Sequence, residues 1–353
     1  MPIPAQRDPA RTRKQLAAWL APRVHADGEV VVGELRGPGA TGFSNETLIL
    51  DASWTEDGDP RAASYVVRVA PSGYTLFPDP AFDRQYRVLR ALRQHTTIPV
   101  PAVRWYETDD SLLGAPFFVM DEVQGVVPPD NPPYHVDGWL HGVTPEHRAR
   151  IWWGCIDTIA DLHRVDWPAL DLDLPAGGLT AQLDYYERFL ASVERDEPVP
   201  VARRALGWLR AHAPDAERQV LTWGDARIGN VMYDAAGAPV AVLDWEMVEV
   251  AAPAVDVTWA MYLDRHHSEA CGVPRLDGFP SKAETVARYE ERSGIRLDNL
   301  DYYEVFAAFR FAVIMGRLAV IFKDWGLLTP DDTMAQDNTA TRLAETVLAE
   351  RRA

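Results

Sequence analysis

The sequence predicts an α+β fold with two lobes: a mostly antiparallel N-terminal sheet with one packed helix, and a larger helical C-terminal lobe. Three observations predict it. Short apolar runs separated by turn residues dominate the first 121 residues, a proline-rich stretch follows Gly125, and helical periodicity dominates the rest of the chain. We therefore expect an N-terminal lobe over 1–121, a linker over 122–126 and a helical lobe over 127–353.

The N-terminal lobe is expected to begin with a short amphipathic helix at 11–22. Apolar residues over 81–93 recur at helical spacing, so this segment predicts the helix packed on the sheet. A turn-rich stretch at 37–45 separates the first two strands. The strand-like runs are 30–35, 47–54, 65–69, 100–106 and 116–120.

The C-terminal lobe opens with an extended connection, because four prolines fall between residues 126 and 133. One β-like interruption, at 220–245, holds two apolar runs joined by the turn 234–237, which predicts a hairpin. Helical periodicity covers the remainder, at 145–164, 181–193, 199–212, 254–264, 281–292, 300–323 and 334–351.

Composition limits the partners. The 353 residues include 35 basic and 52 acidic side chains, a formal charge of −17, so neither nucleic acid nor an anionic membrane is an expected partner. The acidic balance suits either solubility or a cationic substrate. Two cysteines, Cys155 and Cys271, form no disulfide framework or four-ligand zinc site. The apolar run 305–322 contains Arg310 and Arg317, which favours a core helix over a membrane span. With no signal peptide visible, we expect a cytoplasmic protein; its oligomeric state is open.

The segment 221–230 reads LTWGDARIGN, and VLDWE follows at 242–246. An Asp, an Asn five residues later and a second Asp after a hairpin are the residue types that phosphoryl transfer from Mg-ATP requires. One carboxylate accepts or orients the proton of the acceptor hydroxyl, and the other two side chains hold Mg²⁺. Each residue alone could be a turn former or a helix cap, but the three together in this context favour the chemistry.

This stretch resembles the aminoglycoside phosphotransferase family, whose loop reads H-G-D-x-x-x-x-N and whose metal motif reads [IL]-D-[WF]-[ED]. It is most similar to a branch of small-molecule phosphotransferases reading W-G-D-x-R-x-G-N and L-D-W-E-M; members of another branch are fused to acyl-CoA dehydrogenases. The resemblance covers residues 30 to 320 and implies a protein-kinase-like fold with ATP in the cleft. It implies Asp225 as the catalytic base and Asn230 and Asp244 as Mg²⁺ ligands, and we take Arg227, the arginine of the same loop, as a second catalytic residue.

The resemblance also assigns nucleotide contacts to the N-terminal lobe. It puts Ser44 and Asn45 in the loop that covers the phosphates, where small residues let backbone N–H groups approach. The backbone of Asp121 and Val123, at the lobe linker, is expected to pair with the adenine edge.

Three residues depart from the family pattern. Arg68 replaces the phosphate-binding lysine, and Gln85 stands where the family often has the glutamate that pairs with it. The two changes are consistent, because arginine is charged without help. Trp223 replaces the histidine before Gly-Asp and keeps one N–H donor. Asp256 matches a family Asp that supports the loop, and His163 has a core or capping position.

The leading interpretation is an ATP-dependent phosphotransferase that moves the γ-phosphate to a hydroxyl of a small molecule. The alternative is a pseudokinase-like module that binds nucleotide or ligand without turnover. The departures at Arg68, Gln85 and Trp223 favour the alternative, whereas the intact acidic set favours the enzyme. The sequence does not identify the acceptor, since specificity in such a fold lies in the variable helical lobe.

Overall fold

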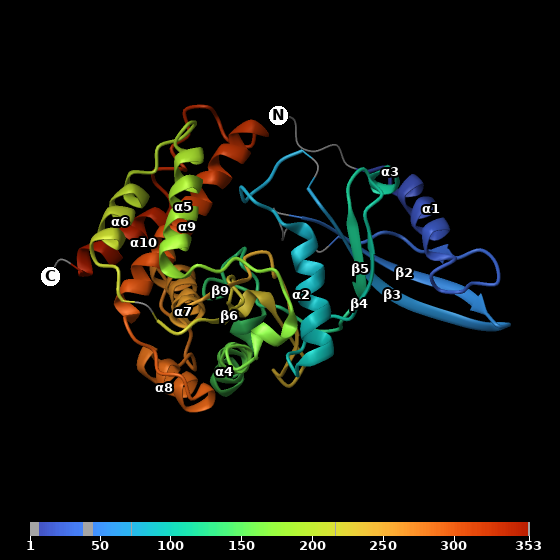
Figure 1. Ribbon diagram of the computed structural model, residues 1–353, viewed down its shortest axis with the longest axis horizontal. Coiled ribbons are helices and arrows are strands. Elements are labelled where there is room, and N and C mark those ends of the chain that lie inside the picture. The colour runs from blue at the N-terminus through green and yellow to red at the C-terminus, as the bar shows by residue number, and fades with distance from the viewer. Residues whose placement is uncertain (1–6, 38–44, 72, 216, 352–353) are drawn as a thin grey trace. The chain divides into compact units, whose positions relative to one another are not determined.

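The computed structural model describes residues 7–37, 45–71, 73–215 and 217–351 (Figure 1). Contacts between Cα atoms divide the chain into two compact units. The first, here called the sheet unit, takes the chain up to Phe82 together with 101–123. The second, here called the helical unit, takes 83–100 together with 124–353.

The sheet unit contains a five-stranded antiparallel sheet in the order β1-β2-β3-β5-β4. A two-residue turn at Asp57 and Gly58 joins β2 to β3, and both turn residues have positive φ, +50° and +82°. An Asp-Gly pair suits such a turn because its twist matches that of the flanking strands. The strands are β1 (Val31–Val32), β2 (Glu46–Glu56), β3 (Asp59–Val69), β4 (Val103–Glu107) and β5 (Phe117–Asp121).

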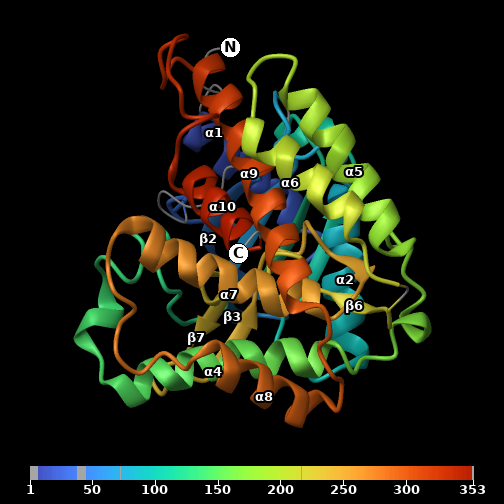
Figure 2. The ribbon, with the colours of Figure 1, turned by 90° about the vertical axis from the view of Figure 1, so that its left-hand side faces the viewer.

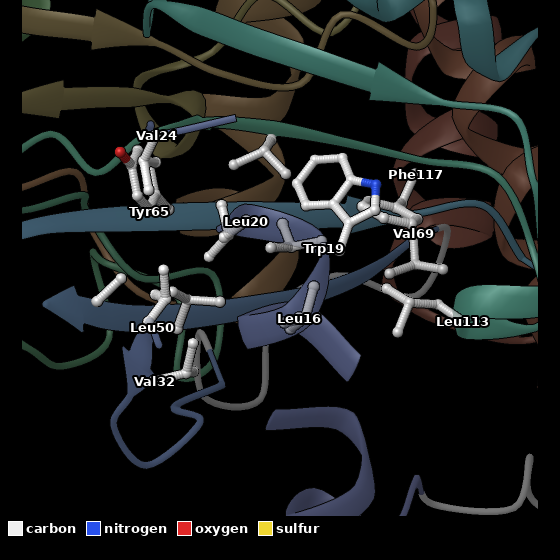
Figure 3. Close-up of a cluster of buried hydrophobic side chains, with 14 of the residues drawn as sticks. Leu16, Trp19, Leu20, Val24, Val32, Leu50, Tyr65, Val69, Leu113 and Phe117 are labelled. Carbon is white, nitrogen blue, oxygen red and sulfur yellow. The ribbon is translucent and has the colours of Figure 1, made fainter. Parts of the chain in front are cut away.

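One face of this sheet is covered by α1 (Pro9–Leu20). This helix begins with two residues that are common at helix starts, Asp8 as the cap and Pro9 in the first turn. The Asp8 side chain accepts from the backbone N–H of Ala10 at 2.9 Å, and proline occupies the first turn, where its missing N–H costs nothing. Figure 3 shows the apolar face of α1 meeting the strands: Leu16, Trp19 and Leu20 lie in one buried cluster with Leu50, Val69 and Phe117. Thus α1 is the helix packed on the sheet within this unit, whereas the helix expected at 81–93 groups with the helical unit.

The helical unit is built around α9 (Leu300–Asp324), which contacts α5, α6, α7 and α10 (Figure 2). This helix is long and apolar enough to cross a membrane, yet 72% of its most apolar window is buried inside the protein. Apart from this group, α4 packs against α8. The remaining helices are α2 (Phe82–His95), α4 (Pro145–Leu162), α5 (Gly178–Val193), α6 (Pro200–Ala211), α7 (Ala254–Ser268), α8 (Lys282–Ser293) and α10 (Thr339–Glu350), and in the sheet unit α3 (Asp110–Leu113).

Two small antiparallel strand pairs interrupt these helices and carry the candidate site. The strand β6 (Val220–Thr222) pairs with β9 (Glu249–Ala251), and β7 (Val231–Tyr233) pairs with β8 (Pro239–Val242). The β7–β8 hairpin turns where the sequence predicts, because the Asp234 carboxylate accepts from the N–H groups of Ala236 and Ala238 at 2.9 Å each. As a result, the loop after β6 and the chain after β8 approach each other.

Candidate functional site

The loop after β6 is held by a buried carboxylate from the first turn of α7. Asp256 is fully buried and accepts from the backbone N–H groups of Trp223 at 2.7 Å and Gly224 at 2.8 Å. His163, at the end of α4, lies with Nε2 3.1 Å from the same carboxylate and Nδ1 2.7 Å from the Tyr289 hydroxyl. Asp256 therefore has the supporting role that the sequence suggests, and His163 orients it.

The turn immediately before Asp225 requires glycine. Gly224 has φ +88°, and a Cβ atom there would fall 2.0 Å from the carbonyl oxygen of Met247. Its own carbonyl oxygen accepts from Nη2 of Arg310 at 3.0 Å. The direction in which Asp225 leaves the strand is thus fixed by backbone contacts on both sides.

The Asp225 carboxylate accepts hydrogen bonds from three side chains. Oδ1 accepts from Nε1 of Trp259 at 2.7 Å, and Oδ2 accepts from Nδ2 of Asn230 at 2.6 Å. Nε of Arg227 lies 3.2 Å and 3.3 Å from the two oxygens. The side chain is still 16% exposed, so the carboxylate is oriented by the protein and partly accessible to solvent.

Arg227 links this carboxylate to a second one. Its Nη1 lies 2.5 Å and 2.6 Å from the oxygens of Asp130, which comes from the proline-rich segment before η1 (Trp139–Gly142). Burial has the largest single effect and raises the pKa of Asp130, but the opposing effects, led by the charge of Arg227 and including its hydrogen bonds, together outweigh burial and leave that pKa lowered. His267 on α7 lies 3.7 Å from Asp130, and burial lowers its pKa to about 4, so its imidazole is neutral at neutral pH.

Asn230 and Asp244 are brought together by the hairpin. Asn230 ends η3 (Ile228–Asn230), directly before β7, and its carbonyl oxygen accepts from the Leu243 N–H at 2.8 Å. Its Nδ2 donates to the carbonyl oxygen of Asp225 at 3.0 Å and to that residue's carboxylate. Because both of these atoms are acceptors, the amide must face them with its NH₂ group, which directs Oδ1 away. Asp244 has φ +55°, a left-handed backbone that Asp tolerates better than most residues.

Trp223 joins the two loops. Its indole N–H donates to the carbonyl oxygens of Leu243 at 2.8 Å and Asp244 at 2.9 Å, and its ring lies 5.9 Å from that of Trp245. The side chain is completely buried. The N–H donor that remains when Trp replaces His is therefore used to connect the Asp225 loop with the Asp244 loop.

Sequence reasoning missed two residues that position Asp225. Trp259 donates to it from α7, and Arg310, buried within α9, lies with its guanidinium 4.6 Å above the Trp259 ring. Nε of Arg310 also donates to the Tyr186 hydroxyl at 3.2 Å. A cation stacked on an indole is an attractive contact that fixes the ring plane. The motif contains no signal for either residue.

The sheet unit carries most of the predicted nucleotide contacts. Ser44 lies outside the described residues, and Asn45 is buried immediately before β2. Arg68 is partly buried on β3, and its Nη1 donates to Thr47 on β2 at 3.2 Å. Among the described residues no carboxylate forms an ion pair with Arg68, so its charge is not neutralised by an acidic partner there.

The remaining predicted contacts lie on α2 and at the end of β5. Gln85 is buried on α2 in the helical unit. The backbone N–H of Asp121 donates to Ala102 at 3.0 Å, so any adenine contact from Asp121 would use its carbonyl oxygen. Val123 follows two residues later and is partly buried.

Comparisons with known proteins show the family to which the chain belongs. A model of the phosphotransferase enzyme family (APH) matches residues 41–291. Acyl-CoA dehydrogenase family member 10 of Mus musculus is 30% identical over 265 residues, which make up 71% of this chain but 24% of that protein. The chain spans only 24% to 39% of the length of the curated relatives it matches.

Two solved structures show the fold. A candidate aminoglycoside phosphotransferase from Ralstonia eutropha has a TM-score of 0.68 at 27% identity, covering 94% of this chain and 98% of that one. Choline kinase from Streptococcus pneumoniae is similar in fold, with a TM-score of 0.59 at 12% identity over 96% of this chain and 98% of that one. These likenesses confirm the kinase-like α+β fold that the sequence predicts.

Proposed function

We propose, because the chain belongs to the phosphotransferase enzyme family, that it transfers the γ-phosphate of ATP to a hydroxyl group of a small molecule. The observation that carries the proposal is the Asp225 carboxylate, held by Trp259, Asn230 and Arg227 and still partly exposed. A carboxylate held by three side chains yet partly exposed is suited to act as a base, because it stays oriented while an acceptor can still reach it.

Asp225 is proposed to accept, or to orient, the proton of the acceptor hydroxyl. A base for this step must be fixed within hydrogen-bond reach of the attacking oxygen, because a misplaced carboxylate contributes little. The contact from Trp259 fixes Oδ1 and the contact from Asn230 fixes Oδ2. The face of the carboxylate that these donors leave open is where we expect the acceptor.

Asn230 and Asp244 are proposed to hold Mg²⁺. The residues fit this ion, because Mg²⁺ prefers oxygen ligands and the amide of Asn230 directs its Oδ1 away from Asp225. When bound, the ion supplies positive charge that neutralises the phosphate oxygens. The chain's own contribution is to keep the two ligands on neighbouring ends of one hairpin, joined through the N–H of Leu243.

The departures from the family pattern at Trp223 and Arg68 leave the proposed contacts in place. Trp223 keeps the two loops joined through its indole N–H, and Arg68 keeps a cation on β3. We therefore favour an active enzyme over a binding module without turnover. The same variants described below separate the two.

The acceptor is proposed to be a small hydroxylated molecule whose class a screen must establish. Aminoglycosides and choline enter the screen because similar solved structures bear those names. Hydroxyacyl thioesters enter it because the curated relatives are named acyl-CoA dehydrogenases. A coupled assay of ADP release, run against each class with Mg-ATP, identifies the substrate.

The test compares substitutions at two carboxylates, which should affect turnover and ATP binding differently. Asp225→Asn keeps the size of the side chain but removes the base, so turnover should fall about 10²- to 10⁴-fold while Mg-ATP affinity stays near that of the wild type. Asp244→Ala should lose both turnover and Mg²⁺-dependent ATP binding by calorimetry. Asp161→Asn, an ion-paired residue on α4, serves as the control and should change neither.

Two results would count against the proposal. Unchanged turnover in Asp225→Asn would remove Asp225 from the mechanism. Mg-ATP binding by a wild type that turns over nothing in the full screen would establish the binding module instead.

A further inference from the structure

We propose that Asp130 is a positioning residue for the transfer reaction: acting through Arg227, it keeps the Asp225 carboxylate facing the acceptor. The inference rests on the proposed function and deepens it. Asp130 lies 97 residues from Arg227 in sequence, within a proline-rich connection. It belongs to no part of the motif that carries the chemistry.

The distances show which carboxylate holds the guanidinium. Nη1 of Arg227 lies 2.5 Å and 2.6 Å from the oxygens of Asp130, whereas Nε lies 3.2 Å and 3.3 Å from those of Asp225. Charged hydrogen bonds of the shorter length are the stronger ones. Asp130 thus anchors Arg227, and Asp225 receives only a longer contact from the same side chain.

This division of contacts matters because arginine stays charged under all ordinary conditions. A guanidinium bound fully to Asp225 would occupy the oxygens that must face the acceptor hydroxyl. Asp130 supplies the counterion that prevents this. The nearby imidazole of His267 does not compete as a cation, since burial lowers its pKa to about 4.

The backbone of Gly229 supports the same arrangement. A Cβ atom at this position would fall 2.5 Å from Nη1 of Arg227 and 2.8 Å from Oδ1 of Asp130. The ion pair therefore packs directly on the glycine. Gly229→Ala would keep every charged group in the chain and still displace the pair, which gives a second and independent way to disturb it.

The kinetic test uses Asp130→Asn, with an acceptor found by the screen. We expect kcat to fall about 10- to 100-fold, as for a base displaced by about an ångström, while the KM for ATP changes less than about 3-fold. Gly229→Ala should lower kcat in the same direction. The control is Asp157→Asn on α4, which breaks a comparable two-oxygen pair with Arg288, a pair that includes no residue of the motif, and should leave kcat unchanged.

The decisive comparison places Asp130→Asn in the Asp225→Asn background. If Asp130 acts by orienting Asp225, the second substitution should lower the residual rate by less than about 2-fold, because the carboxylate it positions is gone. A further 10-fold loss in that background would mean that Asp130 only supports the fold. Such a loss would overturn the proposal.

A second measurement needs no acceptor. The indole N–H of Trp259 donates to Asp225, so its ¹⁵N–¹H NMR signal, assigned with Trp259→Phe, reports how that carboxylate is held. We expect this signal to move in Asp130→Asn. The signal of Trp19, whose indole N–H donates to Glu107 in the sheet unit, should stay in place.

The two measurements distinguish the failure of this inference from the failure of the proposed function. If the wild-type protein transfers phosphate to no acceptor, the proposed function is wrong, and the NMR signal alone then tests whether Asp130 positions Asp225. A Trp259 signal that is identical in the wild type and in Asp130→Asn would overturn the inference whether or not the protein is an enzyme.

Discussion

Removing the carboxylate of Asp256 should destabilise the helical unit and loosen the loop that carries Asp225. Asp256 is completely buried and satisfies the backbone N–H groups of Trp223 and Gly224. Neither N–H can turn to another partner, because each is fixed by the backbone. His163 is different: it can carry its proton on Nδ1, which faces the Tyr289 hydroxyl, and so tolerate the loss.

The size of the effect follows from these contacts. A buried donor left without an acceptor costs about 1–3 kcal/mol, so two of them in Asp256→Ala should lower the free energy of unfolding by about 2–6 kcal/mol. Asp256→Asn keeps one acceptor but turns an NH₂ group toward the other N–H, so it should cost about half as much. The larger loss is a substantial part of the roughly 5–15 kcal/mol that stabilises a typical domain.

The assay combines urea unfolding with hydrogen exchange of the peptide 220–227. Exchange assigns the effect to the loop, which matters because the two units need not unfold together. Asp184→Ala, an exposed residue paired with Arg210, is the control and should stay within about 0.5 kcal/mol of the wild type. If Asp256→Ala unfolds at the wild-type urea concentration and the Trp223 and Gly224 amides stay protected, the supporting role of Asp256 is wrong.

Two further predictions concern charge. The folded pKa of His267 is about 4, against 6.5 ordinarily, so its neutral form contributes stability that is fully present above pH 6.5 and is lost as pH falls toward 4. This difference in pKa corresponds to about 3 kcal/mol of folding free energy. The urea midpoint of His267→Asn should therefore depend less on pH across this range than that of the wild type. Arg68→Ala should weaken ATP binding more than adenosine binding, both measured by calorimetry, because the expected partners of Arg68 are phosphates. The control Arg61→Ala, on the same strand and paired with Glu56, should weaken neither. Equal losses of affinity for both ligands in Arg68→Ala would mean that Arg68 supports the fold instead.

Much of the fold could be predicted because its signals are local. The β7–β8 hairpin was predicted from the turn residues at 234–237, whereas the strands expected at 47–54 and 65–69 stop short of the actual β2–β3 turn at Asp57 and Gly58. The acidic motif was predicted for the same reason: Asp225 and Asn230 are five residues apart, and a recognisable hairpin separates them from Asp244. Each of these features is defined within a window in which residue spacing constrains geometry.

The contacts that position the motif could not be predicted, because they join distant parts of the chain. Asp130 looks like a polar residue of an extended connection until the fold places it on Arg227. Arg310 indicated a core helix rather than a membrane span, but nothing in its apolar surroundings identifies Trp259 or the Gly224 carbonyl oxygen as its partners. Tertiary contacts of this kind leave no periodic trace in the sequence.

The apolar character of α9 has a consequence for how the chain is made. Three of the helices that cover it, α5, α6 and α7, precede it in the sequence and are synthesised first, whereas α10 follows it. A nascent chain that has left the ribosome as far as residue 324 therefore exposes the apolar surface of α9 that α10 later covers. Exposed surface of this kind attracts chaperones and promotes aggregation. Ribosome pausing between α9 and α10 should thus lower the soluble yield, while the same protein, once complete, remains well packed.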